Sequence, residues 1–197
     1  MERRQLLEDW IKTQFPDKPL TLAPASADAS FRRYFRVSFS DGTLVAMDAP
    51  PQQEDCTPFV HVAGLFGAAG VHVPTIVAQD AEQGFMLLSD LGSTTYLQAL
   101  EANAGDADRL YHEATDALVK IQLASRADVL PNYDAAFLLR ELNLFPDWYI
   151  SKHLKINLSD DQKAVIDAVF AEILKNNLAQ PKEFVHRDYR SRNIMIT

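Results

Sequence analysis

The sequence predicts an α+β protein in which a strand-rich lobe, residues 1–90, is followed by a helical lobe, residues 91–197. Within the first lobe, short runs of alternating apolar and polar side chains are separated by turn signals, which is typical of strands. After Gly92 the apolar side chains recur at helical spacing over longer stretches. Many α+β proteins share this order of elements, so the pattern indicates the class and does not by itself indicate the family.

Periodicity and turn residues predict the elements of the first lobe. An amphipathic helix begins the chain and ends at Pro16. Residues 40–42, Ser-Asp-Gly, form a turn signal between two alternating runs and predict a hairpin. A second helix begins at Thr57, with Pro58 at its first helical position, and ends at Gly70. The expected strands are residues 20–22, 31–39, 43–47, 75–78 and 85–89.

Helices dominate the second lobe. The expected helical stretches are residues 94–102, 106–124, 133–154 and 159–177. Ser159 and Gln162 have the spacing of a capping box at the start of the last stretch. Pro146 lies inside the third stretch and is expected to break or kink it. Short apolar runs predict two strands, residues 184–186 and 194–196, on either side of a polar loop.

The composition excludes several functional classes. A net charge of −8, from 19 basic and 27 acidic side chains, argues against sequence-independent binding of nucleic acid. The single cysteine, Cys56, excludes an internal disulfide and a cysteine-based metal site. No secretory signal and no membrane span is expected, so we predict a soluble cytoplasmic protein. Local arginine clusters at residues 32–36 and 187–192 either receive a small anion or are solvated surface charge.

The polar loop carries the strongest chemical signal in the chain. His186, Asp188 and Asn193 match H-R-D-x-x-x-x-N, the motif of the protein-kinase catalytic loop. In that motif the Asp accepts the proton of the attacking hydroxyl, and the Asn holds a magnesium ion between the nucleotide phosphates. Arg190 is placed to balance charge on the transferring phosphoryl oxygens. A chance match is the alternative, because the spacing is short.

Several segments in order resemble the aminoglycoside phosphotransferase family. They are DASFRRYFRV (28–37), LVAMDAPP (44–51), LLSDLG (87–92), LLRELNLFPDWY (138–149) and FVHRDYRSRNIM (184–195). More narrowly, the chain is similar to bacterial kinases that phosphorylate N-acetylmuramate and N-acetylglucosamine at the anomeric hydroxyl in cell-wall recycling. The resemblance covers the whole chain. It implies a protein-kinase-like two-lobe fold and a small-molecule phosphotransferase that uses ATP and Mg²⁺ and acts on an amino sugar.

The resemblance assigns nucleotide-binding roles in the first lobe. Ser30 and Arg32 would contact the nucleotide phosphates, although an ordinary strand connector is the alternative for this loop. Leu88, Asp90 and Leu91 would lie in the hinge between the lobes, where backbone groups bind the adenine edge. A plain strand end and turn would have the same geometry.

The resemblance also assigns the reacting groups. Asp188 would be the base and Asn193 a metal ligand, with Arg190 beside the transferring phosphoryl group. Glu141 would contact sugar hydroxyls from a helix of the second lobe. For the neighbouring Trp148 and Phe145, a place in the hydrophobic core is the default expectation.

The chain departs from the general kinase pattern in two places. Asp48 stands where protein kinases carry a phosphate-binding Lys, so Arg32 and Arg33 are the nearest cations for that role. No Asp follows Asn193 to act as the second magnesium ligand. We therefore expect a piece of a longer protein that tends to self-associate. The alternatives are an aminoglycoside or choline-like kinase, and a non-catalytic nucleotide-binding remnant.

Overall fold

The computed structural model describes residues 2–26 and 31–197, and the chain folds as two compact units. The first, which we call the sheet unit, comprises Met1–Leu123 together with His186–Thr197. The second, which we call the helical unit, comprises Ala124–Val185. The polar loop therefore belongs to the same compact unit as the sheet, although the helical unit separates them in sequence. The boundary expected after residue 90, between a strand-rich lobe and a helical lobe, stays a prediction.

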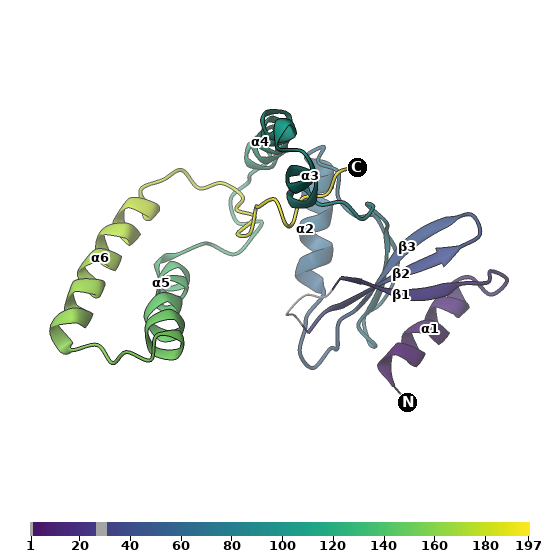
Figure 1. Ribbon diagram of the computed structural model, residues 1–197, viewed down its shortest axis with the longest axis horizontal. Helices are drawn as coiled ribbons and strands as arrows, with labels where there is room; N and C mark the ends of the chain where they lie inside the picture. Colours follow the sequence, from purple (N-terminus) through teal and green to yellow (C-terminus); the bar gives the residue numbers. More distant parts are fainter. Residues whose placement is uncertain (1, 27–30) are drawn as a thin grey trace. The chain divides into compact units, whose positions relative to one another are not determined.

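An antiparallel five-stranded sheet in the order β1-β2-β3-β5-β4 forms the centre of the sheet unit (Figure 1). Its strands are β1 (Thr21–Ser26), β2 (Arg33–Phe39), β3 (Gly42–Asp48), β4 (Ile76–Asp80) and β5 (Phe85–Ser89). The hairpin predicted at residues 40–42 is confirmed, with Phe39 opposite Gly42. A second hairpin joins β4 to β5 through Gly84, which has a φ of 72°. A Cβ atom there would lie 1.9 Å from the Ala49 carbonyl oxygen, so the turn requires glycine.

Two helices cover opposite faces of the sheet (Figure 1). On the face covered by α1 (Arg3–Gln14), the buried side chains are Leu7, Trp10, Ile11, Phe35, Val37, Ala46, Phe85 and Leu87. On the face covered by α2 (Thr57–Ala68), they are Met47, Ala49, Met86 and Leu88, with Phe59 and Val60 of α2 packed against them. Successive residues of β3 and β5 therefore alternate between the α1 side and the α2 side, as a pleated strand requires.

Three further helical segments complete the sheet unit before the chain enters the helical unit. They are α3 (Tyr96–Ala102), the 3₁₀ turn η1 (Ala104–Asp106) and α4 (Ala107–Leu123). Thr95 caps α3, because its side chain accepts a hydrogen bond from the Gln98 N–H, and the Gln98 side chain accepts one from the Thr95 N–H. No helix in the described part of the chain is long and apolar enough to cross a membrane.

The helical unit contains α5 (Ala135–Leu144), η2 (Phe145–His153) and α6 (Asp160–Leu178). The break expected at Pro146 is confirmed as a change of helix type, since η2 is a π-helix. Pro146 has no N–H to donate to the carbonyl four residues earlier, and the wider π-type pattern begins beside it. The capping box predicted for α6 is also confirmed, with Ser159 and Gln162 exchanging hydrogen bonds of 3.0 and 3.3 Å.

The prediction of two strands on either side of the polar loop is wrong. In the described chain, residues 184–186 and 194–196 form no ladder with each other, and the pairing present is an isolated bridge between Thr95 and Met195. The Phe184 N–H donates to Ser125 Oγ at 2.6 Å. The Ile196 N–H donates to the Thr94 carbonyl at 2.9 Å. The backbone of each apolar run thus forms a hydrogen bond to a different neighbour. The length of the runs does not predict these partners.

Candidate active site

The polar loop supplies partners for the start of α3. The first N–H groups of an α-helix have no acceptor within the helix. Here the Tyr96 N–H donates to the Ile194 carbonyl at 2.9 Å, and the Leu97 N–H donates to the Ser191 carbonyl at 3.0 Å. The loop is therefore fixed by backbone groups that a helix must satisfy in any case.

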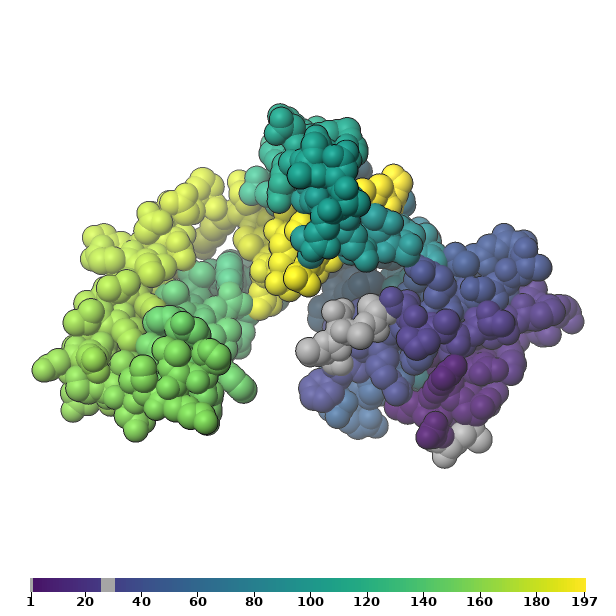
Figure 2. All heavy atoms as spheres, viewed as in Figure 1, coloured from purple at the N-terminus to yellow at the C-terminus, as the bar shows by residue number. Residues whose placement is uncertain are grey.

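Side chains fasten the same loop to α2 and α4. Tyr189 donates its hydroxyl proton to the Ala114 carbonyl of α4 at 2.6 Å. The ring of His186 stacks on Phe66 of α2, with 6.1 Å between ring centroids. Desolvation lowers the pKa of His186, and the nearby Asp188 carboxylate only partly offsets this, so the imidazole is neutral at pH 7. Figure 2 shows the C-terminal residues, in yellow, lying against the atoms of α3 and α4.

Asp188, Arg190 and Asn193 meet within the loop. Asn193 donates its side-chain amide to Asp188 Oδ2 at 2.7 Å and to the Asp188 carbonyl at 3.0 Å. Arg190 Nε lies 2.8 Å from Asp188 Oδ1, in an ion pair whose members are both more than half exposed. These two bonds use the amide nitrogen of Asn193 and not its side-chain oxygen. The predicted base, phosphoryl-binding cation and metal ligand are thus in direct contact.

The backbone just before Asp188 has an uncommon conformation. Arg187 has a φ of 71°, in the left-handed region that non-glycine residues rarely adopt. Such residues cluster at functional sites, where the surrounding structure imposes the strain. Three residues after Arg187, the Arg190 carbonyl accepts the Asn193 N–H at 2.8 Å, which closes the loop into a turn.

The segment after β5, predicted to be the hinge, is tied to β2 by Arg36. Arg36 Nε lies 2.7 Å from Asp90 Oδ2, and Arg36 Nη2 lies 3.0 Å from Asp90 Oδ1 and 2.7 Å from the Gly92 carbonyl. Burial tends to raise the pKa of Asp90, but hydrogen bonds from Arg36, Thr43 and the Gly92 N–H outweigh it and hold that pKa below its usual value. Leu88, two residues earlier, is buried on the α2 side of the sheet.

Asp48 has a structural role on the face away from α2. Its side chain is fully buried and accepts hydrogen bonds from Arg3 of α1, at 2.6 and 2.9 Å, and from Arg33 of β2. Arg3 also donates to the Gln83 carbonyl at 2.6 Å. Asp48 therefore holds α1 on the sheet, and Arg33, a candidate cation for the phosphates, is paired with it. The neighbour on the α2 side is Met47.

The other predicted phosphate contacts lie at the start of β2. Arg32 Nε lies 3.1 Å from Glu54 Oε2, in a partly buried ion pair just before α2. Ser30 lies outside the described residues. The proposed roles of both residues stay predictions.

Glu141 belongs to the helical unit. It lies on α5 and accepts a hydrogen bond from the hydroxyl of Tyr133, whose ring packs edge-on against Phe137. Trp148 and Phe145 are 65% and 48% exposed, so the expectation that these two side chains lie in the core is wrong. The π-helical turn presents them at the surface of the unit.

The chain matches the phosphotransferase enzyme family over residues 21–197. It belongs to this family. The matched range contains the sheet, the segment after β5 and the polar loop. Together with the antiparallel sheet and the helices, the match confirms the predicted α+β, protein-kinase-like class.

Curated relatives of this phosphotransferase-family chain share one name, N-acetylmuramate/N-acetylglucosamine kinase. The Pseudomonas aeruginosa protein is 50% identical over 205 residues, which cover 99% of this chain and 60% of the relative. The Pseudomonas putida protein is 50% identical over 175 residues, covering 89% and 51%. The Neisseria meningitidis protein is 43% identical over 200 residues, covering 100% and 59%. The chain thus spans between 51% and 60% of the length of these relatives.

The family implies a magnesium ion, and the loop has oxygen donors that suit one. Magnesium prefers carboxylate and carbonyl oxygens together with phosphate oxygens of the substrate. The Asn193 amide oxygen and the Asp188 carboxylate are donors of this kind. Among the residues that the structure describes, no three His, Cys, Asp or Glu side chains converge as a metal site. The loop therefore offers oxygen donors of the kind that magnesium takes, and the described residues alone do not make a complete set of ligands.

Sequence reasoning missed three contacts of this family member. Arg36 with Asp90, Tyr189 with Ala114, and the amide of Asn193 with Asp188 were not predicted. The alternation of residues along β2 separates Arg36 from Phe35 and Val37, which lie on the α1 side of the sheet. Only the pairing of that strand with the segment after β5 shows which carboxylate it meets.

Proposed function

We propose that this chain contains the nucleotide-binding sheet and the catalytic loop of an ATP-dependent kinase of amino sugars. The contact of Asp188, Arg190 and Asn193 in the family's loop carries this proposal. The acceptor class, N-acetylmuramate or N-acetylglucosamine, is supported by the names of relatives that are 43–50% identical. An aminoglycoside or choline-like acceptor is the alternative within the same reaction class.

In the proposed reaction, Asp188 accepts the proton of the sugar hydroxyl as the hydroxyl oxygen forms its bond to the γ-phosphorus of ATP. The bond from that phosphorus to the bridging oxygen breaks, and ADP leaves. For this step Arg190 must release Asp188 Oδ1, and its permanent positive charge then lies beside the phosphoryl oxygens. Asn193 would hold the magnesium ion, which neutralises phosphate charge when bound.

The backbone of Asp90 and Leu91 would bind the adenine edge, and Arg32 and Ser30 would contact the phosphates. Glu141 would hydrogen-bond to sugar hydroxyls. These roles follow from the family resemblance, and for Asp90 and Leu91 the local backbone geometry supports them as well.

A single-turnover assay with Mg-ATP and N-acetylmuramate tests the proposal. We expect phosphoryl transfer to fall by about 10²- to 10⁴-fold in Asp188→Asn, because the amide cannot accept the hydroxyl proton. Transfer that is unchanged in Asp188→Asn would exclude Asp188 as the base. Aminoglycoside and choline acceptors in parallel reactions distinguish the alternative substrates.

A non-catalytic nucleotide-binding role is the second candidate, because Asp48, at the position where protein kinases carry a phosphate-binding Lys, is buried and paired with Arg3 and Arg33. Calorimetry with ATP, with and without magnesium, separates the two. Tighter binding with magnesium supports the kinase, and equal binding in both conditions supports the non-catalytic role.

A further inference from the structure

The segment that follows β5 leaves the sheet at a defined residue. The ladder between β3 and β5 ends at Ser89, opposite Leu44. In the described part of the chain, neither Asp90 nor Leu91 forms a backbone-to-backbone hydrogen bond. The polar backbone atoms of both residues therefore lack the partners that regular structure would give them.

One side chain fixes the conformation of this segment. The guanidinium of Arg36 contacts both oxygens of Asp90 and the carbonyl of Gly92, while the Gly92 N–H donates to Asp90 Oδ1 at 2.9 Å. Gly92 has a φ of 93°, so the chain turns sharply at this point. A planar guanidinium has its donors in a fixed fork and can set carboxylate and carbonyl in one geometry, which an ammonium cannot do.

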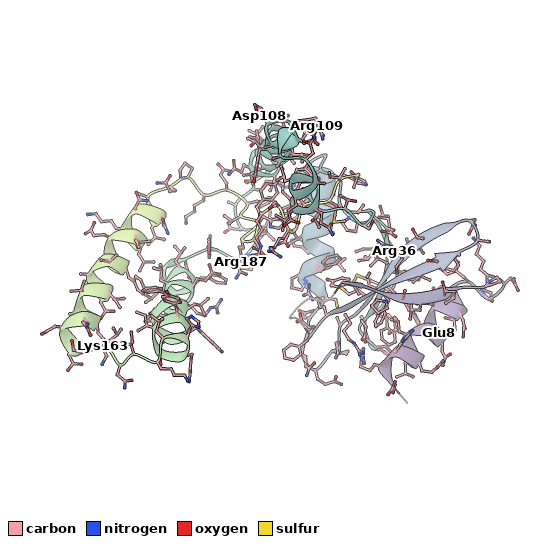
Figure 3. All side chains as sticks on the ribbon, in the orientation of Figure 1. Glu8, Arg36, Asp108, Arg109, Lys163 and Arg187 are labelled. Carbon is pink, nitrogen blue, oxygen red and sulfur yellow. The ribbon has the colours of Figure 1, made fainter. Side chains whose placement is uncertain are left out.

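We call the contacts of Arg36 with Asp90 and Gly92 the clamp. The position of Arg36 on the sheet places the clamp beside apolar side chains. Arg36 lies opposite Val45, and Val45 lies opposite Leu88, so the three side chains form a row on the α2 side. Figure 3 labels Arg36 on β2. This row of side chains therefore runs from Arg36 to the buried Leu88, and Leu88 lies two residues before Asp90.

The clamp is largely withdrawn from water. The Asp90 side chain is 7% exposed and the Arg36 side chain 29%. Removing one member of such a pair leaves the other charge poorly solvated, so its effect is larger than that of a surface pair. The long-range restraints on Asp90 are therefore the Arg36 guanidinium and the hydrogen bond from Thr43.

We propose that Arg36 is a positioning residue for the nucleotide base: through Asp90 and Gly92 it holds the backbone of residues 90–92 in the conformation that binds the adenine edge. This inference rests on the proposed function. The Arg36 guanidinium acts on the nucleotide base through the backbone of residues 90–92. Its effect on binding is therefore confined to ligands that carry a nucleotide base.

Two ligands distinguish a role in positioning the nucleotide base from a general effect on ligand binding. Mg-ATP carries the base and the phosphates, whereas inorganic tripolyphosphate with magnesium carries only the phosphates. We measure both dissociation constants by calorimetry in the wild type, Arg36→Lys and Asp90→Asn, and monitor folding by thermal unfolding. Arg109→Lys is the matched control, because Arg109 on α4 also contacts two carboxylates, at 3.0 and 3.3 Å, but is exposed (Figure 3).

We expect Arg36→Lys and Asp90→Asn to weaken Mg-ATP binding by roughly tenfold or more. Tripolyphosphate binding should stay within about twofold, and the control should change neither constant. In a turnover assay the KM for ATP should rise while the KM for the sugar is retained.

Contrary outcomes are equally clear. Folded Arg36→Lys protein that binds Mg-ATP as tightly as the wild type overturns the inference, and so does an equal loss for both probes. Should Asp90→Asn fail to fold, Arg36→Lys, which keeps the charge, carries the test alone. Wild-type protein that binds neither probe overturns the proposed function itself, which distinguishes that failure from failure of the inference.

Discussion

Asp48 is a fully buried carboxylate, so its charge depends on the two arginines that contact it. We expect Asp48→Ala to lower the free energy of unfolding by about 3 kcal/mol, because the substitution leaves two arginines without their shared partner. Urea denaturation of the purified protein measures this change. In the Asp48→Ala protein we also expect α1 to pack less firmly on the sheet, because Arg3 of α1 loses its contact with Asp48.

The control for Asp48 is Glu8→Gln on α1. Glu8 pairs with Lys12 four residues later, on the exposed side of the helix (Figure 3). This substitution should change the free energy of unfolding little, since exposed ion pairs contribute little. Equal effects of the two substitutions would show that Asp48 does not anchor the helix.

The clamp at Asp90 predicts a pH dependence of stability. The pKa of Asp90 in the folded protein lies below the ordinary value of 3.8, so the folded state favours the ionised form. Its contribution to stability is therefore present above pH 3.8 and is lost as the pH falls through the lower, folded pKa. Asp90→Asn should cost about 2 kcal/mol at pH 7.

Urea denaturation between pH 7 and pH 3 compares the wild type with Asp90→Asn. The difference between their free energies of unfolding should narrow only as the pH falls below about 3.8, where the Asp90 carboxylate of the unfolded wild type becomes protonated before that of the folded protein. A difference that stays constant over this range would mean that Asp90 does not stabilise the fold through its charge.

The residues of the polar loop were predictable as a group, because the motif that they match is local in sequence. Asp188 and Asn193 lie five positions apart, and their contact follows from one turn. Arg36 and Asp90 lie 54 positions apart, and only the register of the sheet brings them together. The face of the sheet on which Asp48 lies was likewise not predictable from the V-A-M-D run. The kinase motif does not indicate which residues of the strand α1 covers.

Among the elements, the β4–β5 turn has the strictest residue requirement. Gly84→Ala should destabilise the protein by about 1–3 kcal/mol, because the new methyl group meets the Ala49 carbonyl and φ is positive. Gly64→Ala is the matched control inside α2, where a Cβ atom meets nothing within 4 Å. There alanine should stabilise the helix by up to about 1 kcal/mol.

Thermal unfolding of both variants tests this prediction. Opposite shifts of the midpoint are expected, downward for Gly84→Ala and upward for Gly64→Ala. A Gly84→Ala midpoint at or above that of the wild type would show that the turn tolerates a side chain.

Elements with a strong repeating pattern were predicted well, whereas the two short apolar runs on either side of the polar loop were not. The helices α1, α2 and α6 and the hairpin at residues 40–42 have periodicity, caps or turn residues that act locally. Residues 194–196 have the composition of a strand, yet they satisfy the backbone at the start of α3. Whether a short run forms a ladder depends on the free backbone groups that lie beside it in the folded chain.

At the scale of the whole molecule, the helical unit exposes apolar side chains along α6. Val165, Val169 and Ile173 follow one another at helical spacing and are 64%, 51% and 37% exposed. Contiguous apolar surface of this kind promotes association in water. We expect copies of the chain to associate through α6 as the concentration rises.

Sedimentation velocity at increasing concentration measures this association. Val169→Lys should reduce it, whereas Ala171→Lys, which adds the same charge at an exposed position of α6 outside this row, should have a smaller effect. A wild-type chain that stays monomeric at all concentrations would contradict the prediction.

The sheet unit is discontinuous, since the loop with Asp188 follows the entire helical unit in sequence but folds with the residues before it. The helical unit is therefore an insertion between two parts of one folding unit. Loop-closure entropy rises slowly with length, by about 0.6 kcal/mol for each doubling, so such an insertion can be lengthened or exchanged at little cost to the unit that surrounds it. Sequence changes and insertions within residues 124–185 can therefore accumulate with little effect on the fold of the unit that contains Asp188.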